Sequence, residues 1–166
     1  MPNGIGSHHR GHEGKNNEWL TPPEIVQALG EFDLDPCSPV NRPWRTAKSH
    51  YTTEDDGLTK PWIGRVWLNP PYGPHTGKWL RRLACHGRGT ALIFARTETE
   101  MFFEHVWGKA SALLFIKGRL HFHYVDGTRA AANSGAPSVL ISYGDEDAQI
   151  LRDCGIKGAY IRLEKD

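Results

Sequence analysis

The sequence has few cysteines, no long apolar run and almost no net charge. Its three cysteines, Cys37, Cys85 and Cys154, lie far apart and form no C-x-x-C pair, which argues against a disulfide framework and against a zinc site. No apolar run approaches the length that spans a membrane. The polar start, rich in glycine and histidine, is unlike a signal peptide. We therefore expect a cytoplasmic protein.

The charge balance is nearly even, with 20 basic and 19 acidic side chains and a formal net charge of +1. A nucleic-acid-binding protein of this charge must concentrate its positive residues locally, so charge neither supports nor excludes DNA. The length of 166 residues fits one domain with a sizeable core. We predict a disordered tail over 1–17, where Ile5 is the one large aliphatic residue, and a single domain over 18–166.

From residue 18 onward, short apolar runs alternate with amphipathic stretches, which is typical of an α/β domain. Capping boxes predict two helix starts, at Thr21 with Glu24 and at Thr97 with Glu100. The apolar runs 112–116 and 138–143 have no helical pattern between them, which favours an antiparallel hairpin at the far end of an otherwise parallel sheet. The predicted strands are 32–35, 65–68, 91–95, 112–116, 138–143 and an edge strand over 159–163, and the predicted helices are 22–29, 75–86, a stretch carrying 102–107, and 146–154.

Asn69-Pro70-Pro71-Tyr72 comes directly after a predicted strand. In open α/β sheets, ligands bind beyond the carboxyl ends of the strands. The two prolines lack N–H donors and stiffen the turn, which leaves the carbonyls of Asn69 and Pro70 as free acceptors. A proline-rich turn without function is the alternative, and the position after a strand favours a functional motif.

This motif suits methylation of an exocyclic amine on a base. The lone pair of such an amine is delocalised into the ring, so the nitrogen is a poor nucleophile. The Asn69 side-chain oxygen and the Pro70 carbonyl can accept its two N–H groups and aim the lone pair at a methyl group. Tyr72 can stack on a base that has been flipped out of a duplex. Catalysis would then rest on orientation and electrostatic complementarity, without a strong base.

Two acidic motifs are candidate cofactor contacts. Asp35 ends the first predicted strand, immediately before Pro36 and Cys37, where a carboxylate can hold an ammonium group. Asp56, in the acidic run 54–58, can accept a hydrogen bond from a ribose or from adenine. The structural alternatives are a strand-ending Asp-Pro turn and a solvated acidic turn, and both stay open at this point.

Two segments are candidate DNA contacts. Residues 41–48 interleave cations with Trp44, a composition that suits phosphates or the gap left by a flipped base, although a plain solvated loop has the same composition. Residues 121–137 would form a small flexible loop between the hairpin strands, with His121, His123 and Arg129. The two histidines would share one face of a strand, but no third ligand stands at a suitable spacing, so we predict no metal site.

Together, the ordered motifs resemble the phage N-6-adenine-methyltransferase (Dam-like) family. The resemblance runs from about residue 18 to residue 143, and the order of the motifs is more specific than any one of them. The motifs are Trp19-x-Thr21-Pro22, Asp35-Pro36-Cys37, Asp56-Gly57-Leu58, Asn69-Pro70-Pro71-Tyr72 and Gly118-Arg119-Leu120-x-Phe122.

The resemblance implies a Rossmann-like S-adenosylmethionine-dependent methyltransferase fold, with a mostly parallel seven-stranded sheet and an antiparallel terminal hairpin. It implies S-adenosylmethionine as methyl donor, adenine N6 in double-stranded DNA as acceptor, a bacterial host cytoplasm, and protection of DNA from restriction as the role. It places catalysis at residues 69–72. The cofactor would be surrounded by Trp19, Thr21, Pro22, Asp35, Pro36, Cys37, Asp56 and Asn69.

Two departures from the broader class of adenine methyltransferases keep alternatives open. Residues 35–39, Asp-Pro-Cys-Ser-Pro, stand where a glycine-rich loop is usual, and the catalytic motif begins with Asn69 where Dam enzymes commonly have Asp. Asn in this place also occurs in methyltransferases that act on RNA bases or on protein glutamine. An inactive nucleic-acid-binding module and a histidine-dependent nuclease are further alternatives. The intact motif argues against the first, and the lack of a carboxylate–histidine cluster argues against the second.

Overall fold

The computed structural model describes residues 19–130 and 134–164. The tail predicted over 1–17 lies outside the described residues. In chain order the elements are α1 (Pro23–Ala28), β1 (Leu34–Asp35), β2 (Ser49–His50), β3 (Val66–Leu68), α2 (Thr76–His86), β4 (Gly89–Phe94), α3 (Glu100–His105), β5 (Ala112–Ile116), β6 (Ser138–Tyr143), α4 (Asp145–Asp153) and β7 (Gly158–Arg162). This order confirms the predicted α/β class. Strand β2 lies in a stretch that the sequence predicts as loop.

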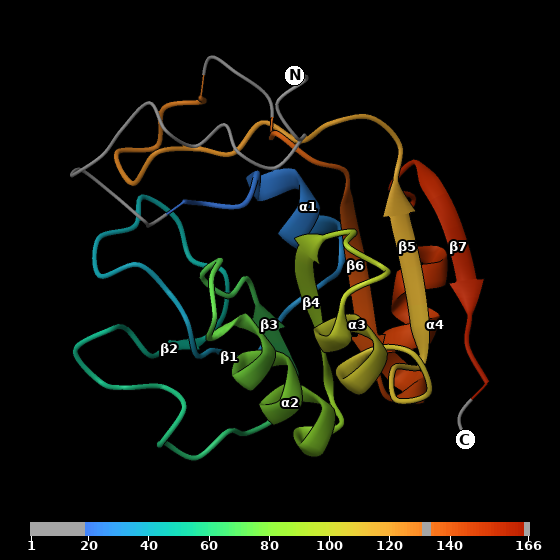
Figure 1. Cartoon of the computed structure of the whole chain (residues 1–166). Coiled ribbons are helices and arrows are strands. Elements are labelled where there is room, and N and C mark those ends of the chain that lie inside the picture. Colours follow the sequence, from blue (N-terminus) through green and yellow to red (C-terminus); the bar gives the residue numbers. More distant parts are fainter. Residues whose placement is uncertain (1–18, 131–133, 165–166) are drawn as a thin grey trace, which may run out of the picture.

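The strands form one seven-stranded sheet in the order β2-β1-β3-β4-β6-β5-β7 (Figure 1). Strands β2, β1, β3 and β4 pair in parallel. Strand β6 pairs antiparallel with β4 and β5, and β7 pairs antiparallel with β5. The antiparallel β5–β6 pair and the β7 edge strand are confirmed. The sheet is less parallel than predicted, because β6 lies between β4 and β5 and runs against both, and β7 also runs against β5.

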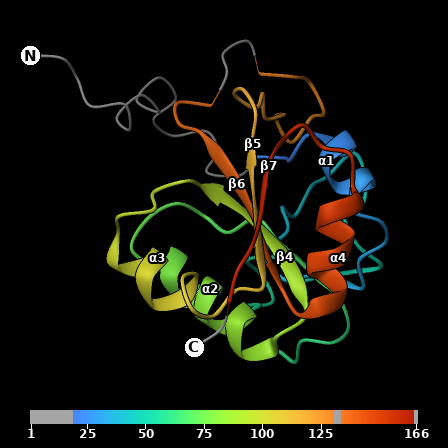
Figure 2. The same ribbon diagram turned by 90° about the vertical axis from the view of Figure 1, so that its right-hand side faces the viewer.

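Helices cover both faces of the sheet, with α2 and α3 on one face and α1 and α4 on the other (Figure 2). The central strands are therefore apolar on both faces. In β4, Leu92 packs in the cluster that contains α1 and α4, while Ile93 packs in the cluster that contains α2 and α3. Since β1, β3 and β4 run the same way, their carboxyl ends meet at one edge, and residues 69–72 begin there.

Both predicted capping boxes are wrong. Helix α1 begins after Pro22 without a side-chain cap, and the Thr21 hydroxyl accepts a hydrogen bond from Asn69 instead. Helix α3 is capped by Thr99, whose side chain accepts from the Phe102 N–H. The spacing matches the capping pattern in both places. However, Thr21 bonds Asn69 instead of the helix, and Thr99, which is nearer to α3 than Thr97, caps that helix.

A buried ion pair joins the start of β3 to α4. Arg65 Nη2 lies 2.8 Å from Asp147 Oδ1, and the two side chains are 7% and 0% exposed. The same guanidinium donates to the carbonyls of Leu29 and Glu31. Burial raises the pKa of Asp147, and the Arg65 guanidinium opposes that rise. The pair therefore ties both helices of this face to the sheet.

We expect Arg65→Ala to lower the free energy of unfolding by about 3–5 kcal/mol, because it leaves a buried carboxylate without its partner. Arg88→Ala is the matched control, since it breaks an exposed pair with Glu146 that contributes about 1 kcal/mol or less. Denaturant unfolding measures both values. Equal losses in the two variants would contradict a special role for the buried pair.

Candidate active site

Asn69 follows β3 and is oriented by Thr21, which precedes α1. Asn69 Nδ2 donates to Thr21 Oγ1 at 3.2 Å, and Thr21 is 2% exposed. With the amide nitrogen held in this way, the amide oxygen is left as an acceptor. The structure thus brings together two residues, 48 positions apart, from separate predicted motifs.

The turn after Asn69 is fixed to α2 and keeps a second acceptor. Thr76 Oγ1 donates to the Pro71 carbonyl at 2.6 Å, and Thr76 is buried at the start of α2. The carbonyl of Pro70 accepts no hydrogen bond from the described residues. The Asn69 side-chain oxygen and the Pro70 carbonyl are therefore two acceptors that the described residues leave without a donor.

Tyr72 stacks on Phe94, the last residue of β4. The ring centroids are 4.3 Å apart and the rings are tilted by 8°. One face of the Tyr72 ring therefore lies on Phe94, while the residue as a whole is 45% exposed. The sequence did not single out Phe94, because it ends an apolar run and no local signal separates it from a core residue.

Asp35 is a buried carboxylate at the carboxyl end of β1, only 3% exposed. Its Oδ1 accepts from the Cys37 N–H at 3.1 Å, and its Oδ2 accepts from the Thr46 hydroxyl. Burial raises the pKa of Asp35 to about 6, although the two hydrogen bonds and the charge of Arg42 pull it down. A cationic group that binds next to such a buried carboxylate stabilises its ionised form.

Thr46 contacts the candidate cofactor residue Asp35, a contact that the sequence does not predict because residues 41–48 suggest a DNA-binding segment. Its backbone N–H donates to His50 Nε2 at 3.3 Å, while its hydroxyl bonds Asp35. Burial, together with the charges of Arg42 and Arg45, lowers the pKa of His50 to about 4. The imidazole is therefore neutral at pH 7 and can accept this hydrogen bond.

The acidic run 54–58 lies against the loop that follows Asp35. A Cβ atom on Gly57 would stand 2.0 Å from the Pro36 carbonyl oxygen, so only glycine permits this approach. Trp62 Nε1 donates to the Gly57 carbonyl at 2.9 Å and holds the segment in place. Asp56 is exposed, and its carboxylate bonds none of the described residues. It is available to a ligand beside the Asp35 loop.

The other predicted cofactor residues are placed as follows. Pro22 is buried before α1, Pro36 is buried against Gly57, and Cys37 supplies its N–H to Asp35. The Trp19 ring lies 5.0 Å from the ring of Tyr124. The structure therefore gathers the Asp35 loop with Gly57, and Thr21 with Asn69, whereas Trp19 packs on the segment after β5.

The segment after β5 forms a small hairpin over 122–130, where we predicted a flexible loop. The Ala130 N–H donates to the Phe122 carbonyl and the Tyr124 N–H donates to the Thr128 carbonyl, both at 2.8 Å. Asp126 Oδ1 accepts from the Thr128 N–H and closes the turn. The signal for this turn was Asp126-Gly127, a pair that favours tight hairpins.

The two candidate DNA segments lie against each other. The Trp44 ring meets the ring of His123 edge-on, with centroids 5.2 Å apart. A Cβ atom on Gly127 would stand 3.2 Å from Pro43 Cγ. Leu20 also pairs with His123 through two backbone hydrogen bonds of 2.8 and 2.9 Å. Residues 43–44 and the 122–130 hairpin therefore form one surface beside Thr21.

One expectation about these segments is wrong. Lys48 lies at the amino end of β1, where it pairs with Glu31 and Asp33 at 3.6 and 3.8 Å, so the far end of 41–48 is not on the site edge. His121 and His123 each place ring Nδ1 against a carbonyl of their own hairpin, that of Ala130 at 3.4 Å and that of Gly127 at 3.1 Å. In the described ranges, no three His, Cys, Asp or Glu side chains are grouped as metal ligands.

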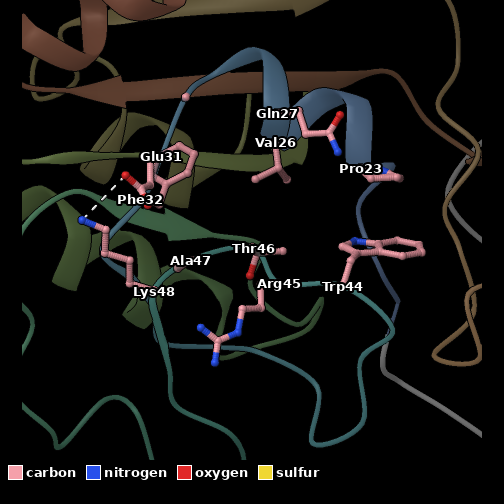
Figure 3. Close-up of a pocket in the computed structure, with 11 residues that line it drawn as sticks. Pro23, Val26, Gln27, Glu31, Phe32, Trp44, Arg45, Thr46, Ala47 and Lys48 are labelled. Atoms are coloured by element: carbon pink, nitrogen blue, oxygen red, sulfur yellow. Dashed lines mark ion pairs between the residues drawn. The ribbon is translucent and has the colours of Figure 1, made fainter.

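A hollow of about 280 Å³ lies between α1 and residues 44–48 (Figure 3). Val26, Phe32 and Trp44 line it, and Thr46, which bonds Asp35, forms part of its wall. None of residues 69–72 lines it. Residues 44–48 of its wall belong to the connection from β1 to β2, which contains no helix, and the lining does not include the Asn69 acceptors.

In the part of the chain that the structure describes, no helix has the length and apolar character of a membrane span.

A mixed α/β sheet with an Asn-Pro-Pro-Tyr turn at its carboxyl edge, and a buried acid on the neighbouring strand, is the architecture of an amine methyltransferase. The chain belongs to the DNA N-6-adenine-methyltransferase (Dam) family, whose family model matches residues 8–150. It is an enzyme that methylates N6 of adenine in DNA, which confirms the predicted family and activity. No curated protein and no solved structure matches the chain significantly.

Proposed function

We propose that the enzyme takes its methyl group from S-adenosylmethionine on a Rossmann-like fold and delivers it to an adenine flipped out of double-stranded DNA. The observation that supports this most is the orientation of Asn69 by Thr21. This bond leaves the amide oxygen as an acceptor, and the carbonyl of the next residue, Pro70, accepts no hydrogen bond from the described residues. An adenine amine has two N–H groups, and these two oxygens match them.

Three features of the chain fit the cofactor. Asp35 is a buried carboxylate without an ion-pair partner in the described ranges, and it suits the ammonium of the methionine end. Asp56 suits a ribose hydroxyl. The close contact of Gly57 with Pro36 holds the segment of Asp56 against the loop that follows Asp35. When bound, S-adenosylmethionine supplies an electrophilic methyl group. The residues proposed to hold it are Trp19, Thr21, Pro22, Asp35, Pro36, Cys37, Asp56 and Asn69.

The residues of the catalytic turn orient the acceptor amine. Asn69 Oδ1 and the Pro70 carbonyl accept its two N–H groups, which withdraws the lone pair from the ring and directs it out of the ring plane. Pro71 holds the turn through its bond with Thr76, and Tyr72 fixes the plane of the base by stacking. No strong base is needed, because the nitrogen becomes acidic only as it acquires the methyl group, and the proton that it then loses can pass to solvent. Catalysis is then orientation and electrostatic complementarity.

Transfer of a tritiated methyl group to duplex DNA, RNA and protein, followed by nucleoside analysis, tests this function. We expect label in N6-methyladenine from duplex DNA. Label in RNA or protein alone would overturn the proposal, and no label in any acceptor would indicate an inactive module. Digestion of the methylated DNA with a panel of restriction enzymes tests the proposed role in protection from restriction.

We also infer that the DNA backbone lies on the surface that residues 43–44 form with the 122–130 hairpin, and on the neighbouring Arg45. The exposed cations Arg45 and Arg129 suit phosphate contacts, which position a duplex without reading its sequence. The double variant Arg45→Gln, Arg129→Gln should weaken DNA binding about tenfold and reduce the slope of log affinity against log salt by about 2. Lys48→Gln, at the other end of the segment, is the control. An unchanged salt slope in the double variant would contradict this placement.

A further inference from the structure

Phe94 lies under Tyr72 and has no part in the mechanism above. Its side chain is 6% exposed and packs in the cluster that contains α1 and α4. Its backbone is held by pairing with Ser138 of β6, and the next residue, Ala95, donates to the Pro137 carbonyl at 2.8 Å. Phe94 is thus a fixed aromatic platform at the carboxyl edge of the sheet.

Tyr72, by contrast, has little else to fix its ring. It stands in the turn before Gly73, whose φ of 140° is open only to glycine. Its hydroxyl makes no hydrogen bond with the described residues, and 45% of the residue is exposed. The parallel stack at 4.3 Å on Phe94 is therefore the contact that sets the orientation of the ring.

We propose that Phe94 is a positioning residue for base binding, which holds Tyr72 so that the outer face of its ring receives the flipped adenine. The bound state is a three-layer stack of adenine, Tyr72 and Phe94. Aromatic pairs attract beyond the area that they bury, and the Arg96 guanidinium, 5.8 Å from the centroid of the Phe94 ring, adds a further contact to the platform. This inference rests on the proposed function, because it needs a base at Tyr72.

Phe94→Leu tests the inference, because it keeps an apolar side chain and removes the ring. Without Phe94 beneath it, the Tyr72 ring spends less time in the orientation that stacks on the flipped adenine. We therefore expect the single-turnover rate on duplex DNA to fall about tenfold. The Kd for S-adenosylmethionine should stay within about twofold of the wild-type value. Phe94→Tyr retains a ring and should recover most of the rate.

Two controls separate positioning from general loss of packing. Phe102→Leu removes another buried ring, which packs on Trp107 in the α3 layer, and it should lower stability without changing the rate. In a Tyr72→Leu background, Phe94→Leu should have no further effect on the rate, because Phe94 acts only through Tyr72.

The outcomes distinguish the inference from the function on which it rests. A wild-type enzyme that does not methylate DNA would overturn the proposed function. An active wild-type enzyme with a Phe94→Leu variant of equal rate would overturn only the inference about Phe94. Additive losses in the double variant would also overturn it, since they would show that Phe94 acts independently of Tyr72.

Discussion

Asn69→Ala should reduce methyl transfer to duplex DNA by about 10²–10³-fold, the effect of removing one preorganised polar group that meets the reacting atoms. The variant retains the Pro70 carbonyl but loses the oxygen that accepts the second N–H of the amine. The loss should appear in single-turnover rates. The Kd for S-adenosylmethionine should change far less, because Asp35 and the loop near Asp56 are intact.

Two further variants locate the effect on the amide oxygen. Asn69→Asp keeps an oxygen in the same place, and Thr21 can donate its hydroxyl to the carboxylate, so much of the activity should remain. Thr21→Val removes the acceptor that holds Asn69 Nδ2 and should lower the rate about tenfold by letting the amide rotate. Unchanged turnover in Asn69→Ala would remove the proposed centre altogether.

The position of the proposed catalytic turn at the end of β3 was predictable because its information is local. Asn69-Pro70-Pro71-Tyr72 follows an apolar run, and the prolines at once end the strand and leave acceptors. The partner of Asn69 was not predictable, since Thr21 is distant in sequence and sits in a pattern that equally suits a helix cap. The same threonine hydroxyl can cap a helix or bond Asn69, and only the tertiary fold decides between these two roles.

Around the proposed cofactor site, too, some residues could be predicted from local sequence, whereas their contacts could not. The acid at the end of β1 could be placed from sequence, because a strand followed by Asp-Pro-Cys ends at a defined edge. The approach of Gly57 to Pro36 depends on packing between two residues that are 21 positions apart, with β2 between them. The bond from Thr46 to Asp35 also comes from a segment whose cations suggested a different role. Local composition thus indicates which residue types a segment offers, while the sheet decides which of them meet.

Asp35→Asn should stabilise the protein in the absence of cofactor. Burial raises the pKa of Asp35 from 3.8 to about 6 in the folded chain, so the folded state binds more protons than the unfolded state between these values. The carboxylate therefore lowers the stability of the wild type as the pH rises through this window. The uncharged amide avoids that loss. The gain in unfolding free energy should be close to zero near pH 4 and up to about 3 kcal/mol near pH 7.5.

The same substitution should weaken S-adenosylmethionine binding about 100-fold near pH 7.5, because a desolvated charge pair with the ammonium is lost. In the wild type, the Kd should rise as the pH falls below about 6, by roughly tenfold per pH unit, and the variant should lack this dependence. Asp33→Asn is the control, since Asp33 accepts from the Arg65 N–H before the strand begins, and it should leave the Kd unchanged. A variant that is only misfolded loses both stability and affinity, whereas Asp35→Asn should gain stability and lose affinity for S-adenosylmethionine. Retention of the wild-type Kd would show that another group holds the methionine end.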